Sequence, residues 1–107
     1  MQPGRRNGGH LAESLFHICQ ADAWNHARLA GAYQADSLHS EGFIHLSSGA
    51  QWPRVRQERF SGVPDLVLLE VDPTKLRWQL IWEGDPERFP HLYGPLNLDA
   101  VVSVEAI

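Results

Sequence analysis

GFIHLS, at residues 42–47, places a single histidine in the middle of an apolar run and follows it with a hydroxyl. Side chains alternate between the two faces of a β-strand, so Phe43, His45 and Ser47 would share one face. A polar group on a largely apolar face needs a hydrogen-bond partner or a ligand. The stretch therefore predicts a strand whose histidine, with Ser47 beside it, faces a binding site.

Two further histidines stand in similar surroundings, one in LFHIC at residues 15–19 and one in FPHLYGP at residues 89–95. The first pattern predicts a strand that carries His17. The second holds His91 between Pro90 and Pro95, which predicts a stiff, irregular loop. A neutral imidazole donates at one nitrogen and accepts at the other, and it titrates near neutrality. Three such residues, including His45, predict one pocket suited to a ribose hydroxyl, a phosphate or a carboxamide.

Composition sets the class of protein. The 107 residues are 43% hydrophobic and 21% charged, as expected for one globular domain that buries roughly two thirds of its unfolded surface. A net charge of −4 argues against a duplex nucleic-acid binder, and no apolar stretch approaches the roughly 18 residues of a membrane span. Cys19 is the only cysteine, which excludes an internal disulfide and favours the reducing cytoplasm. Residues 1–13 are expected to form a flexible arm without a signal-peptide core, before a single domain at 14–107.

The pattern of apolar residues predicts an α+β domain with a mostly antiparallel or mixed sheet. Helices are expected at 21–30, with Asp22 as N-cap and Gly31 after the last turn, and at 49–60, with Ser48 as cap. Residues 36–41 are expected to form a polar loop. The expected strands cover residues 15–19, 33–35, 42–46, 65–72, 75–82 and 98–104.

Several other residues allow both a structural and a functional interpretation. Tyr93 can offer an aromatic wall to a flat ligand, and Glu83 can anchor a ligand, although an acid at a strand end is often only solvated. Cys19 shares the expected face of His17, but a small buried apolar residue is the better interpretation than a nucleophile. Two further histidines, His26 and His39, are expected to be exposed. Trp24 and Trp52 are expected in the core. Trp78 and Trp82 are expected to share one face of a strand, in the core or in the cleft.

Taken together, the motifs resemble the small bacterial family known as domain of unknown function 952, over about residues 14 to 104. The resemblance rests on HIC at 17–19, Trp24, GAY at 31–33, SL at 37–38, EGFIHLS at 41–47, Gln51, DLVLLEVD at 65–72, WE at 82–83 and FPHLYGPL at 89–96. It implies an ADP-ribosyltransferase-like fold, in which a curved, split sheet with two main helices surrounds a central cleft that holds NAD in active members.

The resemblance also implies roles for individual residues. His17 matches the first-strand histidine that commonly bonds a ribose of NAD, and His45 matches a second histidine found in the RNA 2′-phosphotransferase branch. The third position is a glutamate in most transferases, and here either Glu83 or His91 stands in for it. Phe43 or Tyr93 would form a flat wall beside the ligand.

Three interpretations of function follow, and the sequence leaves open whether the protein is an enzyme. The leading one is a domain that binds NAD or a related ADP-ribosyl or phosphorylated nucleotide, with transferase or glycohydrolase chemistry at the ribose anomeric carbon and no metal. The second is a non-catalytic ligand sensor or protein-interaction domain whose partner is unknown. The third is a metal-dependent hydrolase in which His17, His45 and His91 bind zinc.

Overall fold

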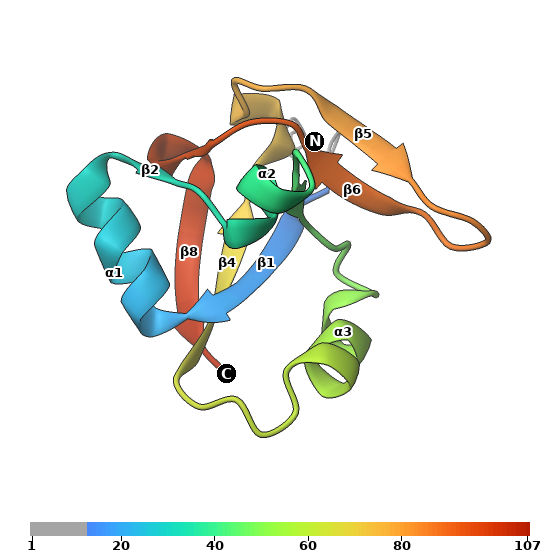
Figure 1. Cartoon of the computed structure of the whole chain (residues 1–107), viewed down its shortest axis with the longest axis horizontal. Coiled ribbons are helices and arrows are strands. Elements are labelled where there is room, and N and C mark those ends of the chain that lie inside the picture. Colours follow the sequence, from blue (N-terminus) through green and yellow to red (C-terminus); the bar gives the residue numbers. More distant parts are fainter. Residues whose placement is uncertain (1–12) are drawn as a thin grey trace, which may run out of the picture.

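The computed structural model describes residues 13–107, and its elements are shown in Figure 1. The flexible arm expected at 1–13 therefore lies outside the described residues, except for Glu13. Within the described part of the chain, no helix is long and apolar enough to cross a membrane.

Antiparallel strand pairs form three small sheets. Their strand orders are β1-β4-β8, β2-β7 and β3-β6-β5, and each pairing is antiparallel. The sequence predicted a mostly antiparallel or a mixed sheet, and residues 13–107 form no mixed sheet. The strands are β1 (Leu15–Gln20), β2 (Ala32–Tyr33), β3 (Ile44–His45), β4 (Leu66–Val71), β5 (Leu80–Glu83), β6 (Phe89–Leu92), β7 (Leu96–Asn97) and β8 (Val101–Ala106). The predicted α+β class is confirmed.

Three α-helices are described: α1 (Ala21–Ala30), α2 (Asp36–Ser40) and α3 (Trp52–Arg59), with the short 3-10 turns η2 (Pro73–Lys75) and η3 (Leu98–Ala100). The two predicted main helices correspond to α1 and α3. The prediction of a polar loop at 36–41 was wrong for α2, because a single helical turn offers no apolar periodicity to detect.

The ends of α1 test two capping predictions. Gly31 follows the helix with φ of +93°, the left-handed conformation that glycine adopts without a Cβ penalty, as predicted. The N-cap prediction was wrong: Gln20 occupies that position, without a side-chain capping bond, and Asp22 lies in the first turn. A carboxylate there still opposes the positive end of the helix dipole.

Helix α3 begins three residues later than predicted, after a tight turn. The Ser48 hydroxyl accepts from the Gln51 amide at 3.2 Å, and the Gln51 side chain accepts from the Ser48 amide at 2.9 Å. This reciprocal pair has the form of a capping box, but it closes the turn before the helix. The N-cap of α3 is Gln51, so the prediction that Ser48 caps the helix was wrong.

Strand β1 separates two hydrophobic clusters. Leu15 and Cys19 pack with Leu69 of β4 on the face covered by α1, while Ile18 and Leu68 pack on the opposite face, against α3. Alternation along the strand turns His17 toward the first of these faces, because it lies two residues from both Leu15 and Cys19.

Three of the predictions in the C-terminal half were wrong. The strand expected at 98–104 begins only at Val101, because residues 98–100 form the 3-10 turn η3. The segment that contains His91 is strand β6, not a loop, because Pro90 is accommodated between two neighbouring strands without breaking the ladder. The alternating pattern at 75–82 becomes a 3-10 turn, a short connection that contains Trp78, and then β5, which carries Trp82. Both indoles are exposed, by 54% and 43%, whereas Trp24 and Trp52 are partly buried against the two clusters.

A single bridge joins the sheet that contains β1 to the sheet that contains β3. Phe16 and Ser47 exchange two backbone hydrogen bonds of 2.8 Å, and no further pairing between these strands follows in the described chain. Beyond this bridge β1 has a free edge, and the two sheets diverge (Figure 1). The divergence opens the space in which the candidate site lies.

Candidate functional site

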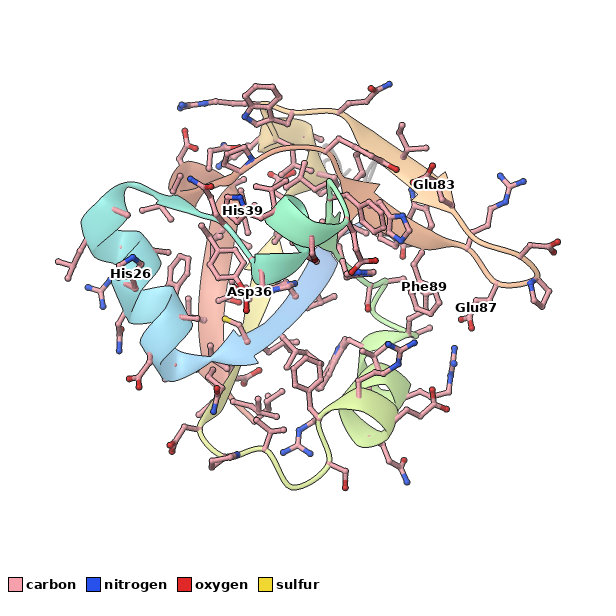
Figure 2. All side chains as sticks on the ribbon, in the orientation of Figure 1. His26, Asp36, His39, Glu83, Glu87 and Phe89 are labelled. Carbon is pink, nitrogen blue, oxygen red and sulfur yellow. The ribbon has the colours of Figure 1, made fainter. Side chains whose placement is uncertain are left out.

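A cleft of about 720 Å³ lies along the free edge of β1, between α3 and the sheet of β3 and β6. One wall is polar and carries all three predicted histidines. The other is apolar and includes Phe16, Val55, Phe60, Val63 and Phe89. Figure 2 shows Phe89 extending from the β5–β6 hairpin toward α3, with Glu83 further along the same hairpin.

His17 is the most constrained of the three histidines. Its Nδ1 lies 2.7 Å from the carbonyl oxygen of His45, and its Nε2 lies 2.8 Å from the Tyr33 hydroxyl. A carbonyl can only accept, so Nδ1 carries the proton and Tyr33 donates to Nε2. Desolvation lowers the pKa of His17 to about 4, so this imidazole is neutral at physiological pH.

These two bonds tie together three strands that meet at the cleft. His17 on β1 binds the backbone of β3 through one nitrogen and β2 through the other. Burial raises the pKa of the Tyr33 hydroxyl, which therefore keeps its proton. Burial likewise raises the pKa of the neighbouring Cys19 thiol, as expected for a packing residue and not for a thiolate nucleophile.

His45 stands at a more open position. Its Nε2 lies 3.2 Å from the Glu41 carboxylate, and both side chains are about half exposed, at 51% and 52%. The His45 ring meets the edge of Phe43 with a centroid distance of 4.9 Å, and it meets His91 at 5.3 Å. These two histidines are directly opposite partners in the β3–β6 ladder, which is why they share one face.

His91 and Glu83 form a hydrogen-bonded pair at the cleft. The His91 Nδ1 lies 2.9 Å from Glu83 Oε1, and the Tyr93 hydroxyl donates to the same oxygen. These bonds, from Tyr93 first and His91 second, lower the pKa of Glu83, while the bond to Glu83 raises the pKa of Tyr93. The carboxylate is therefore ionised and the phenol protonated near neutral pH.

The three predicted ligand-contacting residues have different positions. Ser47 lines the cleft but is buried. Phe43 stacks on the His91 ring at a centroid distance of 3.9 Å and an interplanar angle of 16°, with Tyr93 at 5.3 Å from Phe43. Phe43 and Tyr93 are not among the residues that line the cleft, and Phe43 supports His91 by stacking on its ring.

The sequence analysis missed several residues of the cleft. Tyr33 was assigned only to a short strand, since nothing in its local pattern signals a bond to a histidine 16 residues away. Arg54 and Arg59 of α3 also line the cleft. Arg54 is paired with Glu87 of the hairpin and with Glu58. A charge on the exposed side of a helix gives no local signal of such a role.

The geometry does not assemble a three-histidine metal site. Both ring nitrogens of His17 are bonded within the protein. Across residues 13–107, no group of three or more His, Cys, Asp or Glu side chains is arranged to hold a metal ion. His26 and His39, exposed as predicted, border a second cavity of about 480 Å³ between α1 and residues 32–39, which shares Tyr33, Ala35 and Asp36 with the lining of the cleft.

The fold and the cleft define a small α+β domain in which antiparallel sheets separate along one strand edge and histidines from both sheets face the gap. The chain belongs to the family described as "Protein of unknown function (DUF952)", whose model matches residues 18–104. The family predicted from the sequence motifs is thereby confirmed. No curated protein matches the chain.

Solved structures of a related protein support the fold. The chain is similar to the X-ray crystal structure of protein CC0527 from Caulobacter crescentus, with a TM-score of 0.80 and 33% identity over 87% of this chain and 84% of that one. The solution NMR structure of CC0527 gives a TM-score of 0.73 and 34% identity over 85% and 81% of the two chains. Neither description assigns an activity to that protein.

Proposed function

We propose that the cleft binds NAD or a related ADP-ribosyl or phosphorylated nucleotide, and that it acts at the ribose anomeric carbon. The observation that carries the proposal is the meeting of His17 and His45, from two sheets joined by one bridge, at a single cleft. The ADP-ribosyltransferase-like fold is part of the proposal. Its support is the split between the two sheets along the free edge of β1.

The edge of β1 adds backbone groups suited to a carboxamide. Phe16 directs its amide and carbonyl to Ser47, and alternation along the strand directs those of Ile18 to the same side. No backbone partner for Ile18 on that side occurs within residues 13–107. The Ile18 amide can donate to the carbonyl oxygen of a primary carboxamide such as that of nicotinamide, and the Ile18 carbonyl can accept from the carboxamide NH₂ group.

The residues of the polar wall would divide the remaining contacts. Tyr33 donates to His17, and its oxygen can still accept from a ribose hydroxyl, so His17 positions the ribose through Tyr33. His45, exposed and near the surface, holds a phosphate or the second ribose. The ionised Glu83 stabilises positive charge that develops at the anomeric carbon.

The apolar wall would hold the flat part of the ligand. The sequence analysis assigned this role to Phe43 or Tyr93, whereas the phenylalanine side chains that line the cleft are Phe16, Phe60 and Phe89. Aromatic faces bind planar rings by offset or edge contacts. Arg59, which lines the same wall, can add an attraction for phosphate.

The proposal is tested by titrating the protein with NAD, ADP-ribose and a 2′-phosphorylated nucleotide while recording the histidine ring signals by NMR. Saturable shifts at His17 and His45 together are expected for at least one of the three. Tyr33→Phe and His45→Ala should each weaken binding by about 1–3 kcal/mol, or roughly 5- to 150-fold, because each removes a ligand hydrogen bond.

His26→Ala is the matched control, because His26 lies on α1, across the molecule from Glu83 (Figure 2). It should bind the nucleotide as the wild type does. Equal affinity in the wild type, Tyr33→Phe and His45→Ala, or no shift with any of the three ligands at millimolar concentration, contradicts the proposal.

A ligand sensor without turnover is the second candidate, and one observation favours it. Both nitrogens of His17 are engaged inside the protein, so this residue can position a ligand only through Tyr33 and exchanges no proton with it. A nucleotide recovered unchanged from the bound protein after long incubation would support the sensor. Cys19 is buried and forms no disulfide, which fits a reducing cytoplasm for either function. In that compartment the ligand would be a small nucleotide.

A further inference from the structure

We propose that His91, held by Glu83, is a general base that takes a proton from water in the cleft, so that the reaction is hydrolysis of the bond between ribose and base. This inference rests on the proposed nucleotide site and adds to it the identity of the nucleophile. In this assignment Tyr93 is a positioning residue, Glu83 holds His91 in addition to stabilising charge at the anomeric carbon, and His91 is the residue that contacts the reacting water.

The hydrogen bond to Glu83 determines which nitrogen of His91 can act. An ionised carboxylate only accepts, so the proton lies on Nδ1 and the lone pair lies on Nε2. The bond also stabilises the imidazolium that forms when Nε2 takes up a proton. This is the arrangement that a histidine base requires, because the tautomer and the orientation are both fixed.

The ring of His91 is held on several sides. Phe43 stacks on it at 3.9 Å, His45 meets it edge to face at 5.3 Å, and Glu83 fixes Nδ1 at 2.9 Å. The side chain is 14% exposed, and it lines the cleft together with Glu83. A base fixed in this way loses little freedom when it meets the water.

The other two cleft histidines are poorer candidates for this role. His17 has no nitrogen free, since the His45 carbonyl and the Tyr33 hydroxyl occupy both. His45 also contacts a carboxylate, but that contact is longer, at 3.2 Å, and both groups are about half exposed. Exposed pairs of this kind hold their geometry weakly.

The step balances without another reactant. The bond between the ribose anomeric carbon and the nicotinamide nitrogen breaks, and its electron pair leaves with nicotinamide, whose ring becomes neutral. The water oxygen forms the new bond to the anomeric carbon, and one water proton moves to Nε2 of His91. His91 then releases this proton to solvent, and the products are ADP-ribose, nicotinamide and one proton.

The experiment measures nicotinamide and ADP-ribose released from NAD by the full chain, together with NAD affinity by calorimetry. The wild type should release both products in equal amounts. His91→Gln should lower kcat by about 10²- to 10⁴-fold, the usual contribution of a general base, with NAD affinity changed less than threefold. Glu83→Gln should lower kcat as well, because the amide cannot stabilise the imidazolium by charge.

Two further measurements separate catalysis from a structural role. Added imidazole should restore part of the activity of His91→Ala, an effect that a merely structural histidine does not give. His26→Gln, on α1, is the control and should keep the wild-type rate. Full activity in His91→Gln, or no rescue of an inactive but folded His91→Ala, overturns the assignment of the base.

The outcomes also distinguish this inference from the proposed function. NAD binding without any product overturns hydrolysis and leaves the nucleotide site standing. An absence of NAD binding overturns both.

Discussion

Lowering the pH should destabilise this protein, because the unfolded chain protonates His17 at a higher pH than the folded protein does. Desolvation holds the folded pKa of His17 at about 4, whereas an unfolded histidine titrates near 6.5. Between these pH values the unfolded chain binds a proton that the folded chain does not, so the free energy of unfolding falls as the pH falls. The stability is fully present above about pH 6.5 and is lost progressively toward pH 4.

The size of the effect follows from the same two pKa values. The complete loss corresponds to about 3 kcal/mol, and the part lost between pH 7 and pH 5 is about 2 kcal/mol. For a small domain, 2 kcal/mol is a large fraction of a total stability of about 5–15 kcal/mol. Urea unfolding at pH 7 and pH 5 would detect it as a shift of the midpoint with an unchanged slope.

The variant His17→Gln isolates this contribution, because glutamine does not titrate. It should be less stable than the wild type at pH 7, where it loses the bonds to His45 and Tyr33, but its stability should fall by about 2 kcal/mol less between pH 7 and pH 5. His26→Gln is the control: it measures how much the replacement of a histidine exposed on α1 changes the pH dependence of stability.

An NMR titration of the His17 ring in the wild type gives an independent answer. A midpoint near 4 is expected, and a midpoint near 6.5 would refute the reasoning. Equal pH dependence in the wild type and His17→Gln would do the same.

Three further predictions concern stability, each measured by urea unfolding. Gly94→Ala should destabilise by about 1–3 kcal/mol, because its Cβ would overlap the Trp78 indole, whereas Gly49→Ala, with ordinary contacts at that position, should cost far less. Leu69→Ala should cost about 2–5 kcal/mol, since this side chain is fully buried in the larger cluster, and a loss below 1 kcal/mol would contradict that burial. Ser48→Ala should cost about 0.5–2 kcal/mol by removing one of the reciprocal bonds in the turn before α3, and an unchanged midpoint would show that these bonds do not contribute.

The main elements were predictable because their patterns are local. Alternation around His17, a valine- and leucine-rich run for β4, and Gly31 after α1 each signal their structure within a few residues. The errors fall where the local pattern is weak. Helix α2 is too short to show a period, and the prolines around His91 suggested a loop although the ladder with β3 and β5 accommodates the segment.

The candidate site was predictable only in its parts. The sequence alone determined that three histidines lie among apolar neighbours, and that His45 would turn to one face of a strand, because side-chain alternation depends on nothing beyond the strand itself. The tertiary structure decided which groups meet. It placed Tyr33 on His17 and Glu83 on His91, across 16 and 8 residues, because sheet register and not sequence spacing brings strands together. It also decided that the cleft opens along β1, because within residues 13–107 the backbones of the two sheets pair only at the bridge between Phe16 and Ser47.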